Sequence, residues 1–444
     1  MSHWKRNLIV LCFAQLLTLI GFSAYLPFIP YYVQELGAQS YAEATAWLAV
    51  FDSGAAMAMM LLSPVWGTLA DRYGRKPMLV RATLAGAVLA FLMSLATSPT
   101  QLVALRILQG ALCGTVAAAN TLVATETPDE SLGKGLGIMQ TTQFVGQAAG
   151  PLVGGLAADA FGYRAVFPIS SGMMAVALIA IIALVRERAR TVPAKQPKAR
   201  RHPTRQLLST MATRNTLVLL VALASNSFAL SVLSPIVSLY IKSLSTSTEG
   251  LATLAGAITS VSALSASTSA LALGHLGDKI GRKTVLLGCV IGVALIHVPQ
   301  ALATSPLQLL VLRAIQGLFM GGVIPTANAV LAQSTPVSQR GAIFGLVTSV
   351  QAGGRAVGPL VGAGVSNSWG MRSAFWLTAG IFALISALVG GLVRERQLPE
   401  AEHEPALGAI QPAEGHGLAC PAASPEWACP CQPKASTPAK PGRP

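Results

Sequence analysis

The chain has 444 residues, of which 52% are hydrophobic and only 11% are charged. Soluble domains carry roughly a quarter charged residues, so this composition excludes an ordinary soluble protein and indicates one that lies in a membrane. The formal net charge of +14 could indicate nucleic-acid binding, but most of the 31 Lys and Arg residues fall in segments on one predicted side of the bilayer. Because cytoplasmic loops are enriched in these residues, the charge predicts a topology with both termini in the cytoplasm, and we expect no nucleic-acid partner.

Apolar stretches long enough to span a bilayer recur along the chain. The first is too long for a cleavable signal peptide, so we expect it to remain as span one. We predict six spans in an N-terminal half (residues 1–186), at 7–32, 44–66, 78–97, 101–124, 135–158 and 164–186. A C-terminal half (214–396) has six more, at 215–240, 251–273, 285–303, 307–331, 340–364 and 372–393.

Two polar segments lie outside these halves. A basic segment at 187–213 is predicted to be a cytoplasmic linker, and the tail at 397–444 is rich in Pro, Ala and Glu and predicts disorder. The tail holds Cys420, Cys429 and Cys431, whose spacing matches no standard zinc site, so we expect no metal. No phosphate-binding Gly-rich loop of the ATPase type is present, so we expect no enzyme activity of that kind.

The two halves repeat each other in sequence. The segment 67–76, which reads GTLADRYGRK, returns at 274–283 as GHLGDKIGRK. LRILQG at 105–110 returns at 312–317 as LRAIQG, and GPLVG at 150–154 returns unchanged at 358–362. Two homologous halves in a membrane protein indicate a transporter that opens alternately to each side of the membrane.

The repeated loop resembles the signature of the major facilitator superfamily, and the resemblance covers residues 1 to about 396. Within it, the opening residues 4–30 resemble the twelve-span drug:proton antiporters. The resemblance implies an all-α membrane protein with twelve transmembrane helices in two pseudo-symmetric six-helix halves. It also implies a monomeric, multi-pass protein of the bacterial inner membrane that exports drug-like amphipathic compounds in exchange for protons. Such a protein needs no cofactor beyond the proton gradient; its partners are the small organic substrate, protons and the lipid bilayer.

The two signature loops are predicted to be cytoplasmic. Their glycines permit a tight chain reversal, and the carboxylate of Asp71 is expected to lie at the N-terminal end of span eleven, where the helix dipole stabilises it. That contact would hold the cytoplasmic side closed; the alternative is a turn that only anchors the topology. Glu126, which could instead be solvated, has Gln333 at the equivalent place in the repeat. The predicted latch consists of Gly67, Asp71, Arg72, Gly74, Arg75, Lys76, Glu126, Asp278 and Arg282.

Charged residues at bilayer depth cost about 3 kcal/mol each, so each needs a reason. Arg106 resembles the arginine of the family's span-four motif, which is linked to proton coupling; it could instead donate to backbone carbonyls or glutamines. Asp52 is the acidic residue placed well inside a span and is the leading candidate for a proton carrier. We predict that it pairs with Arg355 when the periplasmic side is closed and that protonation weakens the pair. A static salt bridge or a water-facing acid is the alternative.

A pattern of small residues in span five, Gly146, Gly150, Pro151 and Gly154, is similar to a signature of exporters in the family. Small residues four apart also permit close helix packing, and a related pattern in span eleven weakens any assignment to transport direction alone.

A substrate cavity is expected near the midplane between the halves, where aromatic and amide side chains would suit amphipathic molecules. The candidates are Phe22, Tyr25, Phe51, Asn120, Gln143, Asn226, Phe228, Gln316 and Gln351. Two alternative functions stay open from the sequence: a facilitator, importer or exporter of a specific solute such as a sugar, and a sensor of the same fold that does not transport.

Overall fold

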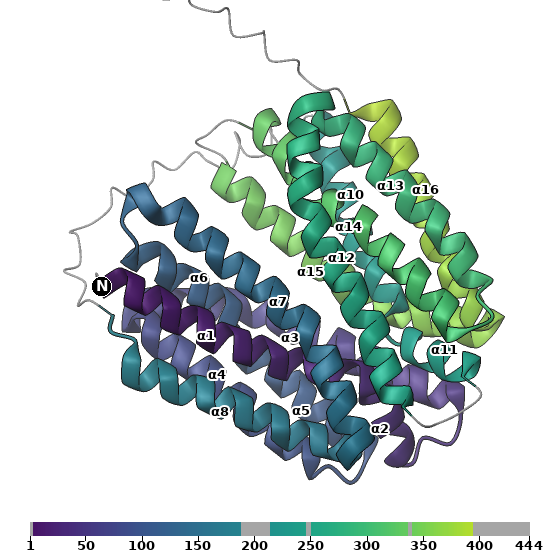
Figure 1. The fold of residues 1–444 in the computed structure, drawn as a ribbon, viewed down its shortest axis with the longest axis horizontal. Coiled ribbons are helices and arrows are strands. Elements are labelled where there is room, and N and C mark those ends of the chain that lie inside the picture. The colour runs from purple at the N-terminus through teal and green to yellow at the C-terminus, as the bar shows by residue number, and fades with distance from the viewer. Residues whose placement is uncertain (1–2, 188–213, 246–249, 336–339, 394–444) are drawn as a thin grey trace, which may run out of the picture. The chain divides into compact units, whose positions relative to one another are not determined.

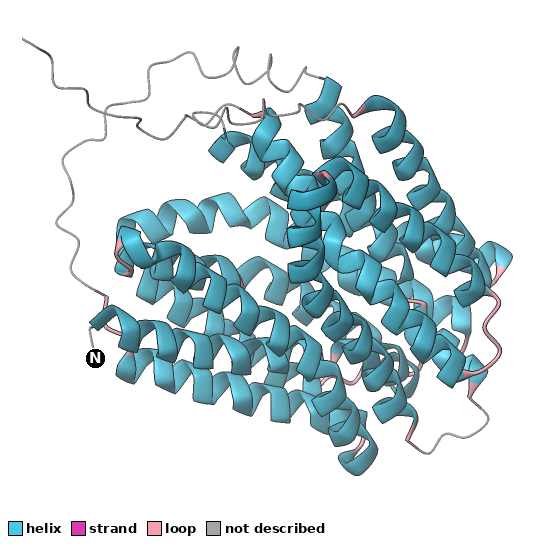
Figure 2. Cartoon of the chain, turned by 45° about the horizontal axis from the view of Figure 1, so that its top comes forward, coloured by secondary structure: helices cyan, strands magenta, loops and turns pink. Residues whose placement is uncertain are grey.

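The computed structural model describes residues 3–187, 214–245, 250–335 and 340–393, and within these ranges the regular elements are all helices (Figure 2). Residues 1–396 form one compact unit. The tail at 397–444 and residues 188–213 of the linker lie outside the described residues. The first half contains α1 (His3–Ala24), η1 (Leu26–Phe28), α2 (Ile29–Glu35), α3 (Tyr41–Tyr73), α4 (Arg75–Ser94), α5 (Pro99–Leu112), α6 (Thr115–Glu126), α7 (Asp129–Phe161), η2 (Tyr163–Ala165) and α8 (Val166–Leu184). The second half contains α10 (Arg214–Leu233), α11 (Val237–Leu244), α12 (Leu251–Ile280), α13 (Arg282–Ala301), α14 (Pro306–Ser334), α15 (Arg340–Trp369) and α16 (Met371–Leu392).

Ten helical segments in the described ranges are long and apolar enough to cross a membrane. The two remaining predicted spans, five and eleven, correspond to α7 and α15, which have 33 and 30 residues. Both are long enough to span, but glycine and polar side chains lower their hydropathy. Small residues are typical of membrane helices that pack closely against protein instead of lipid.

Three predicted spans are interrupted, which the sequence-based prediction did not foresee. Span one breaks between α1 and α2 around Pro27, and span seven breaks between α10 and α11 around Pro235. Proline lacks the N–H that continues a helix and disfavours helical backbone in the residue before it. Span four breaks between α5 and α6 at Gly114, whose φ of +152° suits glycine, whereas its repeat partner α14 is continuous.

Helix packing follows the sequence repeat. In the first half α1 packs on α7, α3 on α5 and α4 on α8; the equivalent pairs in the second half are α10 with α15, α12 with α14 and α13 with α16 (Figure 1). The halves meet where α7 packs on α12 and α3 packs on α15. Spans five and eight, and spans two and eleven, therefore form the interface between the halves.

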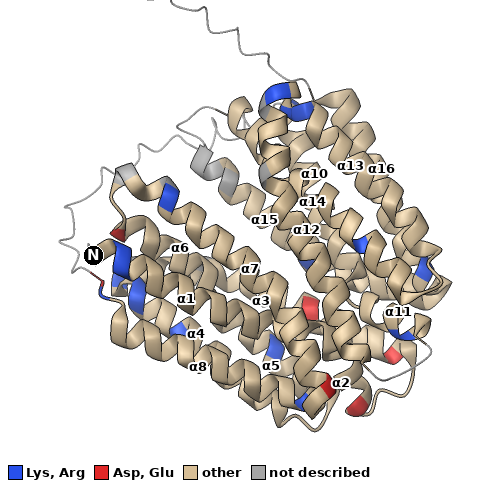
Figure 3. Cartoon of the chain, in the orientation of Figure 1, with Lys and Arg blue, Asp and Glu red and all other residues tan. Residues whose placement is uncertain are grey.

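Each signature loop turns at a glycine with almost the same backbone angle. Gly74 has φ of +95° and Gly281 has φ of +96°, a region that other residues rarely adopt. This confirms that these glycines permit the tight reversal. We call the end of the helices that holds Gly74 and Gly281 the signature-loop end, and the opposite end, which holds Gly162 and Gly370, the far end. Lys and Arg residues gather around the signature-loop end of each half (Figure 3), in keeping with its predicted cytoplasmic location.

The far end is closed by side chains from both halves. Tyr31 donates a hydrogen bond to the carbonyl oxygen of Ser238 (2.6 Å), and Lys242 donates to Gln34 (2.7 Å). The largest buried apolar cluster spans both halves here, while the two other clusters each lie inside one half. The halves are thus joined at the far end, and their hydrophobic cores are separate elsewhere. The cluster that spans both halves includes Tyr25, Phe28, Tyr32, Phe51, Phe167, Leu233, Ile236, Tyr240 and Phe375.

Candidate functional site

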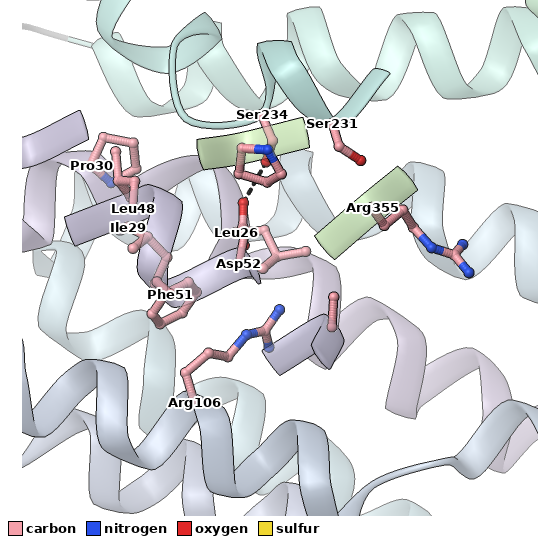
Figure 4. A pocket seen from close by; sticks show the side chains of 12 residues that line it. Leu26, Ile29, Pro30, Leu48, Phe51, Asp52, Arg106, Ser231, Ser234 and Arg355 are labelled. Atoms are coloured by element: carbon pink, nitrogen blue, oxygen red, sulfur yellow. Dashed lines mark hydrogen bonds between the residues drawn. The ribbon is translucent and has the colours of Figure 1, made fainter. Parts of the chain in front are cut away.

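A cavity of about 220 Å³ lies between the two halves. Its walls come from η1, α2, α3 and α5 of the first half and from α10 and α15 of the second (Figure 4). Asp52, Arg106 and Arg355, the three residues predicted to couple protons, all line this one cavity. The other lining residues are Leu26, Ile29, Pro30, Leu48, Phe51, Ala56, Ser231, Ser234 and Pro359.

The carboxylate of Asp52 makes a hydrogen bond between the halves. Asp52 lies on α3 and is half-buried. The hydroxyl of Ser234, which directly follows α10 of the second half, donates to Asp52 Oδ2 over 2.6 Å (Figure 4). A hydroxyl-to-carboxylate bond of this length is charge-assisted and about twice as strong as a neutral one. A proton on Asp52 would therefore weaken a contact that joins the halves.

The guanidinium group of Arg106 is held by groups of its own half. It donates to Gln109 Oε1 (2.6 Å) and to the Tyr25 hydroxyl (3.2 Å), and the same hydroxyl donates to Gln109 Oε1 over 3.0 Å. The centre of the Phe51 ring lies 4.9 Å from the guanidinium carbon, within the range of a cation–π contact. Arg106 thus keeps a fixed positive charge on the cavity wall with a glutamine and a tyrosine as its partners.

Asp52 and Arg355 do not form the predicted ion pair, although the far end is closed in this structure. Both side chains line the cavity, but Arg355 extends away from the carboxylate (Figure 4), and none of the described residues is its hydrogen-bond partner. The prediction of a direct contact was wrong: the Asp52 carboxylate instead accepts from the hydroxyl of Ser234, at the break between α10 and α11.

Of the residues predicted to bind substrate, Phe51 lines the cavity. Tyr25 does not line it, but its hydroxyl accepts a hydrogen bond from Arg106, which does. Several predicted amides are instead engaged inside one half: Gln143 donates to Asn120 (2.9 Å) in the first half, and Gln316 accepts from its neighbour Gln300 (3.0 Å) in the second. The remaining candidates do not line this cavity; they are Phe22, Asn226, Phe228 and Gln351.

Sequence reasoning missed the two serines of the second half. Ser231 lies in the last turn of α10, Ser234 directly follows that helix, and Pro235 comes next. Hydroxyl groups just before a helix-breaking proline in an apolar span were the signal that could have identified them, because polar side chains at membrane depth gather where a helix is interrupted.

Comparison with known proteins decides the family. The sequence profile of the Major Facilitator Superfamily matches residues 11–258 and 219–427. The chain belongs to this superfamily. It is 34% identical over 403 residues to the multidrug resistance protein MdtG of Escherichia coli (strain K12), an alignment that covers 90% of this chain and 98% of the relative.

Solved structures of other transporters share the fold at low sequence identity. The nucleoside transporter NupG gives a TM-score of 0.71 at 13% identity and covers 88% of this chain and 98% of its own. The D-xylose-proton symporter gives 0.69 at 17% identity, with 89% and 99% covered. These likenesses confirm the predicted fold class of two pseudo-symmetric halves.

The first signature loop of this superfamily member is held by a carboxylate that the sequence analysis assigned to the linker. Glu187, just after α8, accepts hydrogen bonds from the backbone N–H groups of Arg75 and Lys76, both at 2.9 Å. These are the first two residues of α4, so the carboxylate lies at the positive end of that helix. Arg75 also donates to the carbonyl oxygen of Thr121 (3.0 Å), and Lys76 donates to that of Val185 (2.6 Å).

Parts of the predicted latch and the three cysteines of the tail lie outside the described residues. The side chains of Asp71 and Asp278 are among them, so the predicted contact of Asp71 with span eleven remains a prediction. The expectation that the tail cysteines bind no metal also remains a prediction. Glu126 lies 3.9 Å from His3 Nδ1. Within the described ranges, no group of three His, Cys, Asp or Glu side chains is placed to hold a metal ion.

Replacing Glu187 is expected to destabilise the first half in a graded way. Glu187→Gln keeps the shape and one acceptor but removes the charge at the α4 N-terminus, a loss of about 0.3–1 kcal/mol. Glu187→Ala also leaves two N–H groups unsatisfied, a larger loss of about 0.5–2 kcal/mol. The midpoint of thermal unfolding of the purified protein in detergent should fall in the order wild type, Gln, Ala. Equal midpoints for all three proteins would contradict this role.

The glycines of span five permit close contact between α7 and α1. A Cβ atom on Gly150 would lie 2.7 Å from the carbonyl oxygen of Ile20, and one on Gly154 would collide with that of Ala24. In the second half, Gly362 packs in the same way against the carbonyl of Val232 on α10. Helix packing is therefore a confirmed role of this motif in both halves, whereas its link to transport direction remains a prediction.

Proposed function

We propose that this protein is a proton-coupled antiporter that exports amphipathic organic compounds by alternating access. The observation that carries the proposal is the hydrogen bond from Ser234 to Asp52, which joins the two halves through a group able to bind a proton. The similarity to the multidrug resistance protein MdtG supports an export role. We place the protein in the bacterial inner membrane as a monomer, with both termini in the cytoplasm and with the proton gradient as its energy source.

The cavity is smaller than a typical binding site for a drug-sized molecule. Sites for drug-sized ligands usually measure about 300–1,000 Å³, whereas this cavity measures about 220 Å³ in the closed far-end arrangement. We therefore assign it to the proton-coupling site and to one edge of the substrate path. We propose that the substrate path continues from this cavity toward the signature-loop end.

In the proposed cycle, the substrate enters from the signature-loop end while deprotonated Asp52 binds Ser234. Arg106, fixed by Gln109 and Tyr25, keeps its positive charge on the same wall of the cavity as Asp52. A proton that reaches Asp52 from the far-end side removes the charge-assisted bond and favours separation of the halves at the far end, where the substrate leaves. Loss of that proton to the cytoplasm resets the protein.

Purified protein in proteoliposomes tests this proposal. The vesicles carry a pH-sensitive dye inside and an imposed pH gradient. Addition of ethidium, as a lipophilic cation, or carboxyfluorescein, as an organic anion, should change the internal pH faster than the passive proton leak without substrate does. Proton movement and substrate accumulation should both disappear when the gradient is collapsed. Gradient-independent equilibration of a sugar would instead support a facilitator, and binding without any flux would support a sensor.

A further inference from the structure

Helix α12 begins at the far end, and its first turn is bound by a side chain of the other half. It starts at Leu251, and the preceding Gly250 offers no side chain. Two of its first N–H groups bind a carboxylate of the first half: Ala252 N–H donates to Asp159 Oδ1 (3.2 Å), and Thr253 N–H donates to Oδ2 (2.8 Å). Asp159 lies in the last turn of α7. One side chain of the first half thus satisfies the N-terminus of a second-half helix.

Three other helices that begin at the far end are capped within their own half. Ser40 precedes α3, Ser98 precedes α5 and Ser305 precedes α14, and each hydroxyl accepts a hydrogen bond from an N–H in the first turn of its helix. Such caps stabilise a helix whatever the two halves do relative to each other. The cap of α12 differs because it exists only while α7 and α12 stay together.

Close backbone contact surrounds this cap. A Cβ atom on Gly155, one turn before Asp159, would lie 2.7 Å from the carbonyl oxygen of Ala252. One on Gly256 would collide with the carbonyl oxygen of Pro151 on α7. The two helices therefore touch along their backbones next to the Asp159 contact, and the far end cannot open between them without separating Asp159 from α12.

We propose that Asp159 is a positioning residue of the transport cycle, whose carboxylate holds the far end closed by binding the first turn of α12 and releases it each time that end opens. This inference rests on the proposed alternating-access function. The donors are backbone groups fixed by the helix, so they cannot follow a moving carboxylate as flexible side chains can. Once the N···O distances exceed about 3.5 Å, both bonds are lost together.

The contact combines a charge, two hydrogen bonds and the positive end of a helix, so its loss should change the equilibrium between closed and open far ends about tenfold. Spin labels report this equilibrium directly. Leu95 and Leu302, at repeat-related positions after α4 and α13, are 59% and 55% exposed and suit labelling. In a background with the six cysteines replaced by serine, Leu95→Cys and Leu302→Cys are labelled, and the distance between labels is measured by double electron–electron resonance in nanodiscs.

Asp159→Ala should increase the ratio of long to short distances about tenfold, and Asp159→Asn, which keeps an acceptor without the charge, should increase it less. Asp159→Glu should restore part of the closed population. Ser305→Ala is the matched control, because it removes a far-end cap inside one half and should leave the distances unchanged. An Asp159→Ala distribution equal to that of wild type, or an equal shift in Ser305→Ala, would overturn the proposal.

The distance measurement needs neither substrate nor a pH gradient. If proton antiport in proteoliposomes fails, the distance measurement still shows whether Asp159 holds the far end closed. If Asp159 proves to have no effect on the distances, the antiport result is unaffected. Asp159→Asn keeps the test decisive even if Asp159→Ala does not fold, because a neutral acceptor at the same position retains one hydrogen bond to α12.

Discussion

Asp52→Asn is expected to abolish proton-driven efflux while leaving the protein folded and able to bind substrate. Asparagine keeps the size of the side chain and an oxygen that can accept from Ser234, but it cannot gain or lose a proton. In inverted membrane vesicles, accumulation driven by a pH gradient should fall to background. Exchange of labelled for unlabelled substrate without a gradient should continue, because it requires only that the halves rock with substrate bound.

The energies explain why one bond can couple a proton to a conformation without locking the protein. A hydrogen bond to a charged group contributes about 1.5–3 kcal/mol and a neutral one about 0.5–1.5 kcal/mol. Protonation of Asp52 thus weakens its bond to Ser234 by about 1 kcal/mol, which changes a conformational equilibrium about fivefold. Other far-end contacts, such as that of Tyr31 with Ser238, supply the rest of the closure and do not depend on this proton.

Glu43→Gln is the matched control for Asp52→Asn. Glu43 lies on the same helix, but its carboxylate accepts from the backbone N–H of Gln39 in its own half. Its loss should leave gradient-driven accumulation near the wild-type rate. Normal accumulation by Asp52→Asn would show that another group carries the proton, and loss of exchange as well would show that Asp52 serves folding or binding instead.

The architecture could be read from the sequence because a repeat and a hydropathy pattern are both long-range signals. The two signature loops predicted equivalent turns, and Gly74 and Gly281 adopt nearly equal angles. The breaks at Pro27 and Pro235 were missed because an apolar stretch of spanning length hides a short interruption. The break at Gly114 could not be inferred from the repeat, since the equivalent stretch in α14 is one continuous helix.

The candidate site was predicted only in part, since the sequence identifies charged residues in spans but not their partners. Because a charged side chain at bilayer depth is costly, we singled out Asp52, Arg106 and Arg355, and all three line one cavity. Ser234 can reach Asp52 only if α10 ends just before it, and the sequence does not give the end of a helix to within one residue. The sequence predicted a carboxylate–helix contact for Asp71 at the signature-loop end. The structure shows a contact of this kind at the far end, made by Asp159, which the sequence analysis did not single out.

Gly154→Ala is expected to destabilise the protein markedly, although alanine normally favours a helix. Replacing glycine by alanine inside a helix gains about 1 kcal/mol from helix propensity. At Gly154 the added methyl group collides with the carbonyl oxygen of Ala24, and a backbone atom cannot move aside as a side chain does. Overpacking costs about 1–3 kcal/mol, and a clash with a backbone atom belongs at the upper end, so after the gain in propensity the protein should lose about 2 kcal/mol and its thermal unfolding midpoint should fall. Differential scanning fluorimetry of the purified protein in detergent measures it.

Two further glycines distinguish packing from a role in transport direction. Gly137 lies on the same helix with no atom within 4 Å of an added Cβ, so Gly137→Ala should leave the midpoint unchanged or raise it. Gly362, which packs against Val232 in the second half, should respond as Gly154 does. If packing is the main role, Gly154→Ala and Gly362→Ala lower stability to a similar extent and impair transport in both directions. If the span-five pattern sets direction, Gly154→Ala alone should change the ratio of efflux to uptake while both variants keep the wild-type midpoint.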